Sequence, residues 1–254
     1  MTVNETIQSL LNHRSVRDFK PQPLDDQTLA TLLEVAHQGA SSMFLQEFSI
    51  LSITDQAIKD QLAEICGQSQ HQVNRNGHLF VFVADQYRNQ LIASQQQVDT
   101  TLLHETDRLL GCVYDATIGA QSLITAAESL GLGTVVLGSI LNDARQVIQL
   151  LHLPHLTFPL FAVAVGYPND LPEQKPRLPQ SVVNFTNTYQ LPVDFEAQLD
   201  AYDTELQSYY EQRHLNPRRE TFRQSLAREV VSSPRHRREL LAILKEQGFL
   251  EHDR

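Results

Sequence analysis

A single helix-favouring stretch, from Asp99 to Leu130, is the longest regular pattern in this sequence, and the rest of the chain has to pack around it. The stretch contains no proline, is rich in leucine and alanine, and carries apolar residues on most faces of the helix it forms. A helix of that length spans about 45 Å. Its all-round apolarity predicts a central core element or an interface rather than a surface helix.

Shorter helix and strand patterns alternate around this stretch. Asn4 precedes the first helical pattern, and Asp25 or Asp26 precedes the second. Strands are predicted at 48–54, 78–84, 134–137 and 160–165, and further helices at 55–65 and 143–151. The strand at 78–84 is apolar throughout, which predicts burial on both faces. From Phe195 onward the pattern is helical only, at 195–212, 220–231 and 239–247.

The composition excludes several classes of protein. With 254 residues, 41% hydrophobic and 20% charged, the chain is long enough to bury a core without disulfides. Its apolar runs are too short to span a membrane, and its first residues do not resemble a secretory signal, so we expect a cytoplasmic protein. Cys66 and Cys112 lack CxxC spacing, which fits a reducing compartment and offers neither a zinc site nor a redox pair.

A cluster of hydrogen-bond donors follows the first predicted helix, in the sequence His13-Arg-Ser-Val-Arg-Asp-Phe19. Two guanidinium groups, a hydroxyl and an imidazole so close together can surround a phosphate with charge-assisted hydrogen bonds. An exposed turn in which Arg17 pairs with Asp18 explains the same residues equally well.

Three further segments carry polar or cationic groups. Lys175-Pro-Arg-Leu-Pro179 presents two cations from a stiff backbone, although a proline-rich connector accounts for it too. Ser41-Ser42 and Gly67-Gln-Ser-Gln70 lie in predicted loops after helices, where they could contact a heterocycle or simply cap the helices. The stretch from Arg213 to Arg238 holds eight arginines and two glutamates, which indicates either an anion site or a solvated helical face.

Two familiar signatures are excluded by their context. Gly131-Leu-Gly133 follows a helix and precedes a strand, the reverse of a dinucleotide-binding fingerprint, so we interpret it as a helix terminus. His152 and His155 are separated by Pro154 and cannot face one metal from successive helical turns, so no metal site is predicted.

In their order along the chain, six segments resemble the nitroreductase family, in its branch of oxygen-insensitive NADPH nitroreductases and NADPH-flavin oxidoreductases. The resemblance covers essentially the whole chain. The segments are His13–Phe19, Ala40–Gln46, Ala127–Gly138, Leu160–Phe161 with Gly166–Pro168, Lys175–Pro179 and Asn216–Arg219.

This resemblance implies an α+β fold, in which a mixed β-sheet of about five strands is flanked by helices. It also implies an intertwined homodimer with FMN at the subunit interface and the long helix as the buried spine of the dimer. Residues 1–190 correspond to the FMN-binding core. Residues 191–254 correspond to a helical C-terminal extension that wraps the dimer and carries the NADPH-binding arginines.

The resemblance also implies which residues bind the two cofactors. Arg213 and Arg218 match the residues that bind NADPH, the reductant. The residues that match those binding FMN, which is held non-covalently, are His13, Arg14, Ser15, Arg17, Ser41, Gln70, Val136, Leu137, Gly138, Ser139, Lys175 and Arg177. No residue is expected as catalytic acid, base or nucleophile, because the flavin carries the hydride. Met43 and Ser139 depart from the family pattern close to the expected flavin pocket, and could change its shape or polarity.

The leading functional hypothesis is an FMN-dependent NADPH oxidoreductase that reduces nitroaromatics, quinones or free flavin in a ping-pong reaction. Its partners are then small electron acceptors and a second copy of the chain. The alternative is a non-catalytic protein that stores or senses FMN. Nucleic-acid binding through the arginine-rich stretch is disfavoured by the net charge of -10, because an acidic protein repels a polyanion.

Overall fold

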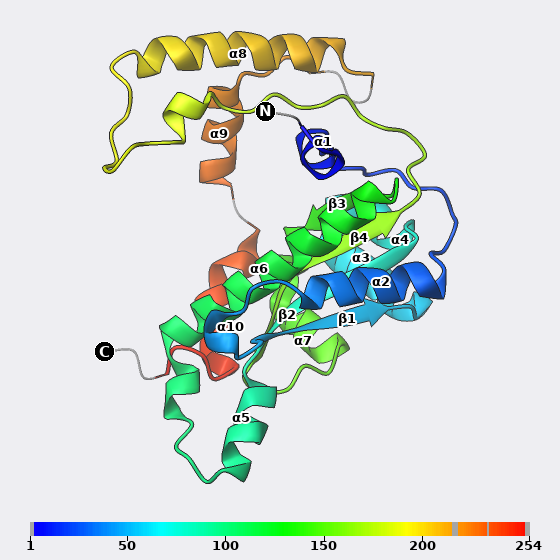
Figure 1. Cartoon of the computed structure of the whole chain (residues 1–254), viewed down its shortest axis with the longest axis vertical. Helices are drawn as coiled ribbons and strands as arrows, with labels where there is room; N and C mark the ends of the chain where they lie inside the picture. The colour runs from blue at the N-terminus through cyan, green and yellow to red at the C-terminus, as the bar shows by residue number, and fades with distance from the viewer. Residues whose placement is uncertain (1–2, 215–217, 233, 252–254) are drawn as a thin grey trace. The chain divides into compact units, whose positions relative to one another are not determined.

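The computed structural model describes residues 3–214, 218–232 and 234–251. Its contacts divide the chain into two compact units. The first unit contains the residues up to Asp170 together with those from Pro234 onward, and the second contains residues 171–233. The segment after Pro234 therefore returns to the first unit (Figure 1).

The first unit is built on a four-stranded sheet in the order β1-β2-β4-β3 (Figure 1). The strands are β1 (Phe48–Ile53), β2 (His78–Asp85), β3 (Gly133–Leu137) and β4 (Thr157–Gly166). All neighbouring strands pair antiparallel, and the one parallel contact of the described sheet region is an isolated bridge between Ser15 and Thr134. The α+β class is confirmed, but the described residues form four strands rather than about five, because the Ser15 contact is too short to make a strand.

Proline inside β4 is accommodated by an irregularity in the ladder. Pro159 has no N–H to donate, and the register between β2 and β4 shifts between Phe82 and Val83, opposite this proline. The shift lets β4 continue to Gly166.

The two faces of the sheet carry different helices, because successive side chains of a strand point to opposite sides. Phe80 and Phe82 pack with α2 (Asp26–His37) and α6 (Thr106–Ser129). Leu79 and Val81 pack with α3 (Gln56–Cys66) and α7 (Ala144–Leu150). Every residue of β2 is buried, as the sequence predicts for a strand covered on both faces.

Helix α6 is the long element expected from the sequence, but it begins later. Residues Thr101–His104 form a 3-10 turn and Glu105 has extended backbone angles, so the helix starts at Thr106 and contains 24 residues, not the full stretch from 99. At its other end Gly131 has a φ of 78° and donates to the carbonyl of Glu128 at 3.0 Å. This confirms the glycine pair as a helix terminus.

Side-chain caps fix the starts of the first two helices. Asn4 accepts from the N–H of Ile7 at the start of α1 (Glu5–Leu11), and Asp25, rather than Asp26, caps α2. Two helices form where no helical pattern is predicted from the sequence, α4 (Gln70–Asn74) and α5 (Tyr87–Gln95). Gln70 thus begins a helix instead of ending a loop. The short 3-10 turns are η1 (Ser42–Phe44), η2 (Gly67–Ser69), η3 (Thr101–His104), η4 (Gly138–Asp143), η5 (Gln180–Val182) and η6 (Arg235–Glu239).

The C-terminal part of the first unit completes a third apolar cluster. Helix α10 (Leu240–Glu246) supplies Ile243, and Phe249 follows it; both are buried with Leu156 and Phe158. Arg145 of α7 pairs with Glu246 at 2.6 Å and also with Glu239.

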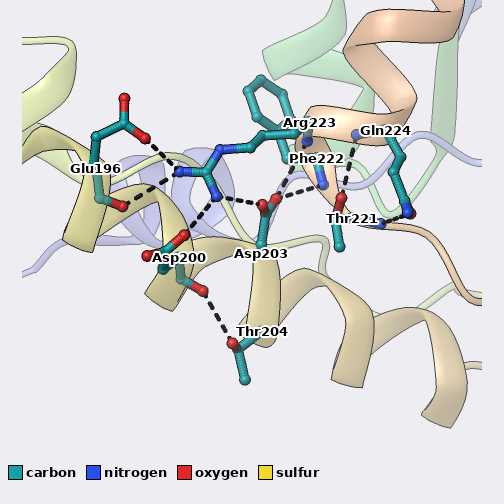
Figure 2. A network of polar contacts seen from close by, with 8 residues as sticks. All are labelled: Glu196, Asp200, Asp203, Thr204, Thr221, Phe222, Arg223 and Gln224. Atoms are coloured by element: carbon teal, nitrogen blue, oxygen red, sulfur yellow. Dashed lines mark hydrogen bonds and ion pairs between the residues drawn. The ribbon is translucent and has the colours of Figure 1, made fainter.

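The second unit contains α8 (Phe195–Gln212) and α9 (Phe222–Val231) around a small core of Tyr202, Leu206 and Tyr210. Figure 2 shows how α9 is joined to α8. Arg223 forms ion pairs with Asp200 at 2.6 Å, Glu196 at 2.9 Å and Asp203 at 3.0 Å, and Asp203 also accepts from the N–H of Phe222 at 2.8 Å.

Candidate functional site

The segment from His13 to Phe19 runs in extended form beside the start of β3. Ser15 bridges Thr134 in parallel, and the N–H of Val16 donates to the carbonyl of Thr134 at 2.9 Å. Val16 and Phe19 are buried, and a Cβ on Gly133 would lie only 2.7 Å from Val16. The glycine therefore allows the donor-rich segment to lie directly against the sheet.

His13 is held in place by the end of α6. Its Nδ1 lies 2.8 Å from Oε1 of Glu128, and the hydroxyl of Thr134 donates to the same oxygen at 2.7 Å. These contacts orient the imidazole through Nδ1, and Nε2 is the ring atom left for a ligand.

The two arginines of the segment have no acidic partner in the described part of the chain. Arg17 is exposed and makes one long hydrogen bond, 3.4 Å, to the carbonyl of Ser15. Asp18 instead accepts from Asn169 at 2.8 Å and contacts His71 at 3.3 Å, and these two interactions lower its pKa. The turn in which Arg17 pairs with Asp18 is thus not formed, and both Arg14 and Arg17 keep donors for a ligand.

The same region brings two other predicted segments near the donors. Gln70 is exposed at the start of α4, next to His71, which contacts Asp18. Val136 and Leu137 end β3, two residues beyond the Ser15–Thr134 bridge, and Gly138 and Ser139 begin η4. Val136 and Gly138 are exposed, whereas the Oγ of Ser139 is buried.

Arg237 is a residue of this region that the sequence did not single out. It donates to the carbonyl of Gly138, and its Nε donates to Oδ1 of Asn142 at 3.1 Å. The C-terminal segment of the first unit thereby contributes a cation to the end of β3. Its only signal in the sequence is membership of the arginine-rich stretch.

Ser41 belongs to a loop that Asp115 of α6 organises. The carboxylate of Asp115, which is buried, accepts from the Ser41 hydroxyl at 2.6 Å and from the N–H groups of Ser42 at 2.7 Å and Glu47 at 3.0 Å. Between these points Met43, Phe44 and Gln46 adopt positive φ angles, which side chains rarely favour. Asp115 could be noticed in the sequence only as a lone acid among apolar helix residues.

Ser41 and His13 are bonded to residues at different positions along α6. Their anchors on the helix, Asp115 and Glu128, are 13 residues apart, which corresponds to about 20 Å along the helix axis. Within one chain the structure thus groups His13 to Arg17 with Val136 to Ser139, and places Ser41 elsewhere.

The remaining predicted site residues lie in the second unit. Lys175 and Arg177 line an open cavity of about 620 Å³ between the segment 174–177 and α8. Lys175, Arg213 and Arg218 all approach the ring of Tyr210, at 5.3, 4.9 and 4.1 Å from its centre. Asn216 and Pro217, which precede Arg218 in the family motif, lie outside the described residues.

Much of the arginine-rich stretch is neutralised by acids. Arg223 contacts three carboxylates, Arg228 pairs with Glu220 and Glu229, and Arg219 lies 3.2 Å from Glu211. Arg218 is paired with Glu220 at 3.2 Å. The ion pairs of Arg219, Arg223 and Arg228 favour a solvated helical face for this part of the stretch.

Two kinds of site are missing from the described residues. No described helix is both long and apolar enough to cross a membrane. Searched over the same residues, histidine, cysteine, aspartate and glutamate side chains nowhere gather in a group of three that could hold a metal ion. Cys66 and Cys112 are buried, unpaired thiols.

Comparisons with known proteins match nearly the whole chain. The nitroreductase family model matches residues 10–167, and the model of the family's C-terminal domain matches residues 175–252. FMN reductase (NADPH) of Bacillus subtilis (strain 168) is 36% identical over 249 residues, covering 97% of this chain and 99% of that protein.

Two solved structures show the same fold. The NfrA1 nitroreductase of B. subtilis superposes with a TM-score of 0.92 at 36% identity, covering 97% of this chain and 100% of that one. The NADPH:FMN oxidoreductase of Vibrio harveyi, complexed with NAD+, has a TM-score of 0.85 at 33% identity and covers 98% and 100%. With both family models matched along the chain, this protein belongs to the nitroreductase family.

Proposed function

We propose that this protein is an FMN-dependent NADPH oxidoreductase that reduces nitroaromatics, quinones or free flavin in a ping-pong reaction. The observation that carries the proposal is the donor set of His13, Arg14, Ser15 and Arg17, laid along β3 with both guanidinium groups lacking an acidic partner in the described chain. A phosphate monoester is the ligand that such donors suit.

The residues fit FMN beyond its phosphate. Gln70 and the exposed backbone at Val136 and Gly138 lie along the same end of the sheet and offer polar contacts and a flat edge for the ring system. Lys175 and Arg177 provide a second cationic segment. When bound, FMN supplies the hydride chemistry, and these residues bind it, orient it and neutralise its charge.

We propose that the active protein is a homodimer. Ser41 is anchored about 20 Å along α6 from the contact that holds His13, so Ser41 serves the flavin bound by the partner chain. Exposed apolar side chains on α6, namely Leu110, Tyr114 and Ile118, supply surface for the contact. Light scattering should give twice the mass of one chain, and a monomer with full FMN occupancy would refute this assembly.

Arg213 and Arg218 are proposed to bind the 2′-phosphate of NADPH, with residues 191–254 acting as the extension that carries them over the dimer. Guanidinium groups suit this dianion, and both arginines lie over the ring of Tyr210. The two unpaired cysteines fit a reducing compartment, so we assign the enzyme to the cytoplasm.

The test is made on the purified protein. Acid precipitation should release FMN rather than FAD, NADPH should bleach the bound pigment, and a nitroaromatic, a quinone or free FMN should restore its colour. Recovery of FAD, or of no flavin after reconstitution, refutes the cofactor. A pigment that NADPH does not bleach within seconds identifies the alternative, a protein that only stores or senses FMN.

A further inference from the structure

Three cations from three separate segments converge on one buried tyrosine in the second unit. Tyr210 of α8 is 1% exposed. Lys175 precedes α8, Arg213 follows it directly, and Arg218 lies beyond; all three approach the ring of Tyr210 within about 5 Å of its centre. We call these three cations with Tyr210 the tyrosine cluster.

Tyr210 makes more than ring contacts with Arg218. The guanidinium of Arg218 donates to the Tyr210 hydroxyl, and the main-chain N–H of Arg218 donates to the Tyr210 carbonyl at 3.3 Å. Burial raises the pKa of the Tyr210 phenol, but hydrogen bonds from Lys175 and Arg218 outweigh burial and lower it overall. The phenol oxygen is therefore an acceptor for cations.

Like charges placed so close together repel, and the described acids beside the cluster are shared with other groups. Glu220 pairs with Arg218 but is shared with Arg228, and Glu173 near Arg213 is shared with His214. Arg223, by contrast, is surrounded by three carboxylates of its own (Figure 2). The acid that pairs with Arg218 is thus divided between two arginines, which leaves donors of Arg218 for an anion.

We propose that Tyr210 is a positioning residue, which holds Arg213 and Arg218 together as one preassembled site for the 2′-phosphate of NADPH. This rests on the proposed function, which assigns Arg213 and Arg218 to NADPH. Long cationic side chains lose conformational freedom when they bind an anion. Contact with a fixed aromatic ring restricts them before binding, so less conformational entropy is lost on binding. Lys175 also lines the neighbouring cavity between the segment 174–177 and α8.

Tyr202 provides a matched control on the same helix. It is also buried, at 5% exposed, and its hydroxyl donates to the carbonyl of Pro176 at 3.1 Å. Its ring packs on Phe222 at 5.4 Å between ring centres instead of on a cation. Removing the Tyr202 hydroxyl therefore perturbs the same core without removing a contact between a cation and an aromatic ring.

The experiment compares Tyr210→Leu, Tyr210→Phe and Tyr202→Phe in the flavin-loaded enzyme. Adenosine 2′-monophosphate is the probe, measured as a competitive inhibitor against NADPH beside adenosine 5′-monophosphate. We expect Tyr210→Leu to raise the inhibition constant of the 2′-phosphate and the KM for NADPH about tenfold, and Tyr210→Phe, which keeps the ring face, about threefold. In the flavin-loaded enzyme, NADH activity and the values for the 5′-phosphate should stay as in the wild type, and Tyr202→Phe should leave these and the 2′-phosphate values unchanged.

The outcomes separate the two proposals. If Arg213→Ala and Arg218→Ala leave the preference for NADPH intact, the assignment of NADPH to these arginines is wrong. If they weaken it while both Tyr210 variants retain their FMN and bind the 2′-phosphate normally, only the positioning role is overturned. Equal losses with NADPH and NADH in Tyr210→Phe would also overturn it, since they would mean that Tyr210 serves packing alone.

Discussion

Glu47 lies directly against Gly111 of α6: a Cβ atom at Gly111 would stand 2.1 Å from Oε2 of Glu47. Glu47 is fully buried just before β1. The glycine leaves room for an acid beneath the loop that carries Ser41.

Gly111→Ala should destabilise the protein although alanine favours helices. The added methyl group must displace Glu47 or shift α6, and overpacking of this kind typically costs about 1–3 kcal/mol. Thermal unfolding measures the loss, and Thr117→Ala, at an exposed position of the same helix, controls for helix propensity. If steric contact is the cause, Gly111→Ala combined with Glu47→Ala should lose less than the sum of the two single changes.

Glu47→Gln should stabilise the protein at alkaline pH. Burial, with a smaller contribution from the charge of Asp115, raises the pKa of Glu47 above its ordinary 4.5. The folded state therefore binds this proton more tightly than the unfolded state, and the stabilisation present below pH 4.5 is lost as pH rises through the raised pKa. Urea unfolding from pH 5 to pH 9 should show a gain for the variant that grows with pH; a constant gain would mean that charge is not the cause.

His78 should make the protein less stable in mild acid. Burial, assisted by the charge of Lys59, lowers the pKa of His78 from 6.5 to about 4. The unfolded state then binds the proton first, so stability is complete above pH 6.5 and falls by about 3 kcal/mol as pH drops toward 4.

His78→Leu should flatten this part of the pH profile. The measurement is best made in the Glu47→Gln background, because protonation of Glu47 has the opposite sign in an overlapping range. An unchanged slope between pH 4 and 6.5 would assign the acid sensitivity to other groups.

Arg17→Ala should weaken FMN binding. The side chain is exposed and without an acidic partner in the described structure, so its removal takes away a ligand contact rather than an internal ion pair. A charge-assisted hydrogen bond to phosphate contributes about 1.5–3 kcal/mol, which is a ten- to hundredfold rise in the dissociation constant. Fluorescence titration of the apoprotein measures it, with Arg75→Ala as the control because Arg75 is a nearby exposed cation that influences Asp18.

Local signals in the sequence predicted those parts of the fold that depend on a few adjacent residues. Asn4, Asp25 and Gly131 mark helix ends because their side chains or backbone angles act within one turn. The same logic failed at Asp99, where a 3-10 turn and an extended Glu105 delay the helix without any proline to mark the change.

Contacts between residues far apart in the sequence could not be predicted from such local signals. The bonds from Asp115 to Ser41 and from Arg237 to Gly138 join residues 74 and 99 positions apart, and each depends on the packing of whole elements. The pairing of Arg218 with Glu220 and Tyr210 likewise depends on how the chain returns to α8. The donor types at His13 to Arg17 were readable from the sequence, but their freedom from Asp18 was not, because His71 and Asn169 come from other segments.

The return of the chain to the first unit after Pro234 has a consequence for biosynthesis. Ile243 and Phe249 fill the third apolar cluster of the first unit, yet the ribosome makes them only after the whole of residues 171–233. The nascent first unit therefore exposes Leu156 and Phe158 while the second unit is being synthesised. This third cluster can close only after translation has passed Phe249, so a stalled or shortened chain leaves an apolar surface for chaperones and proteases to recognise.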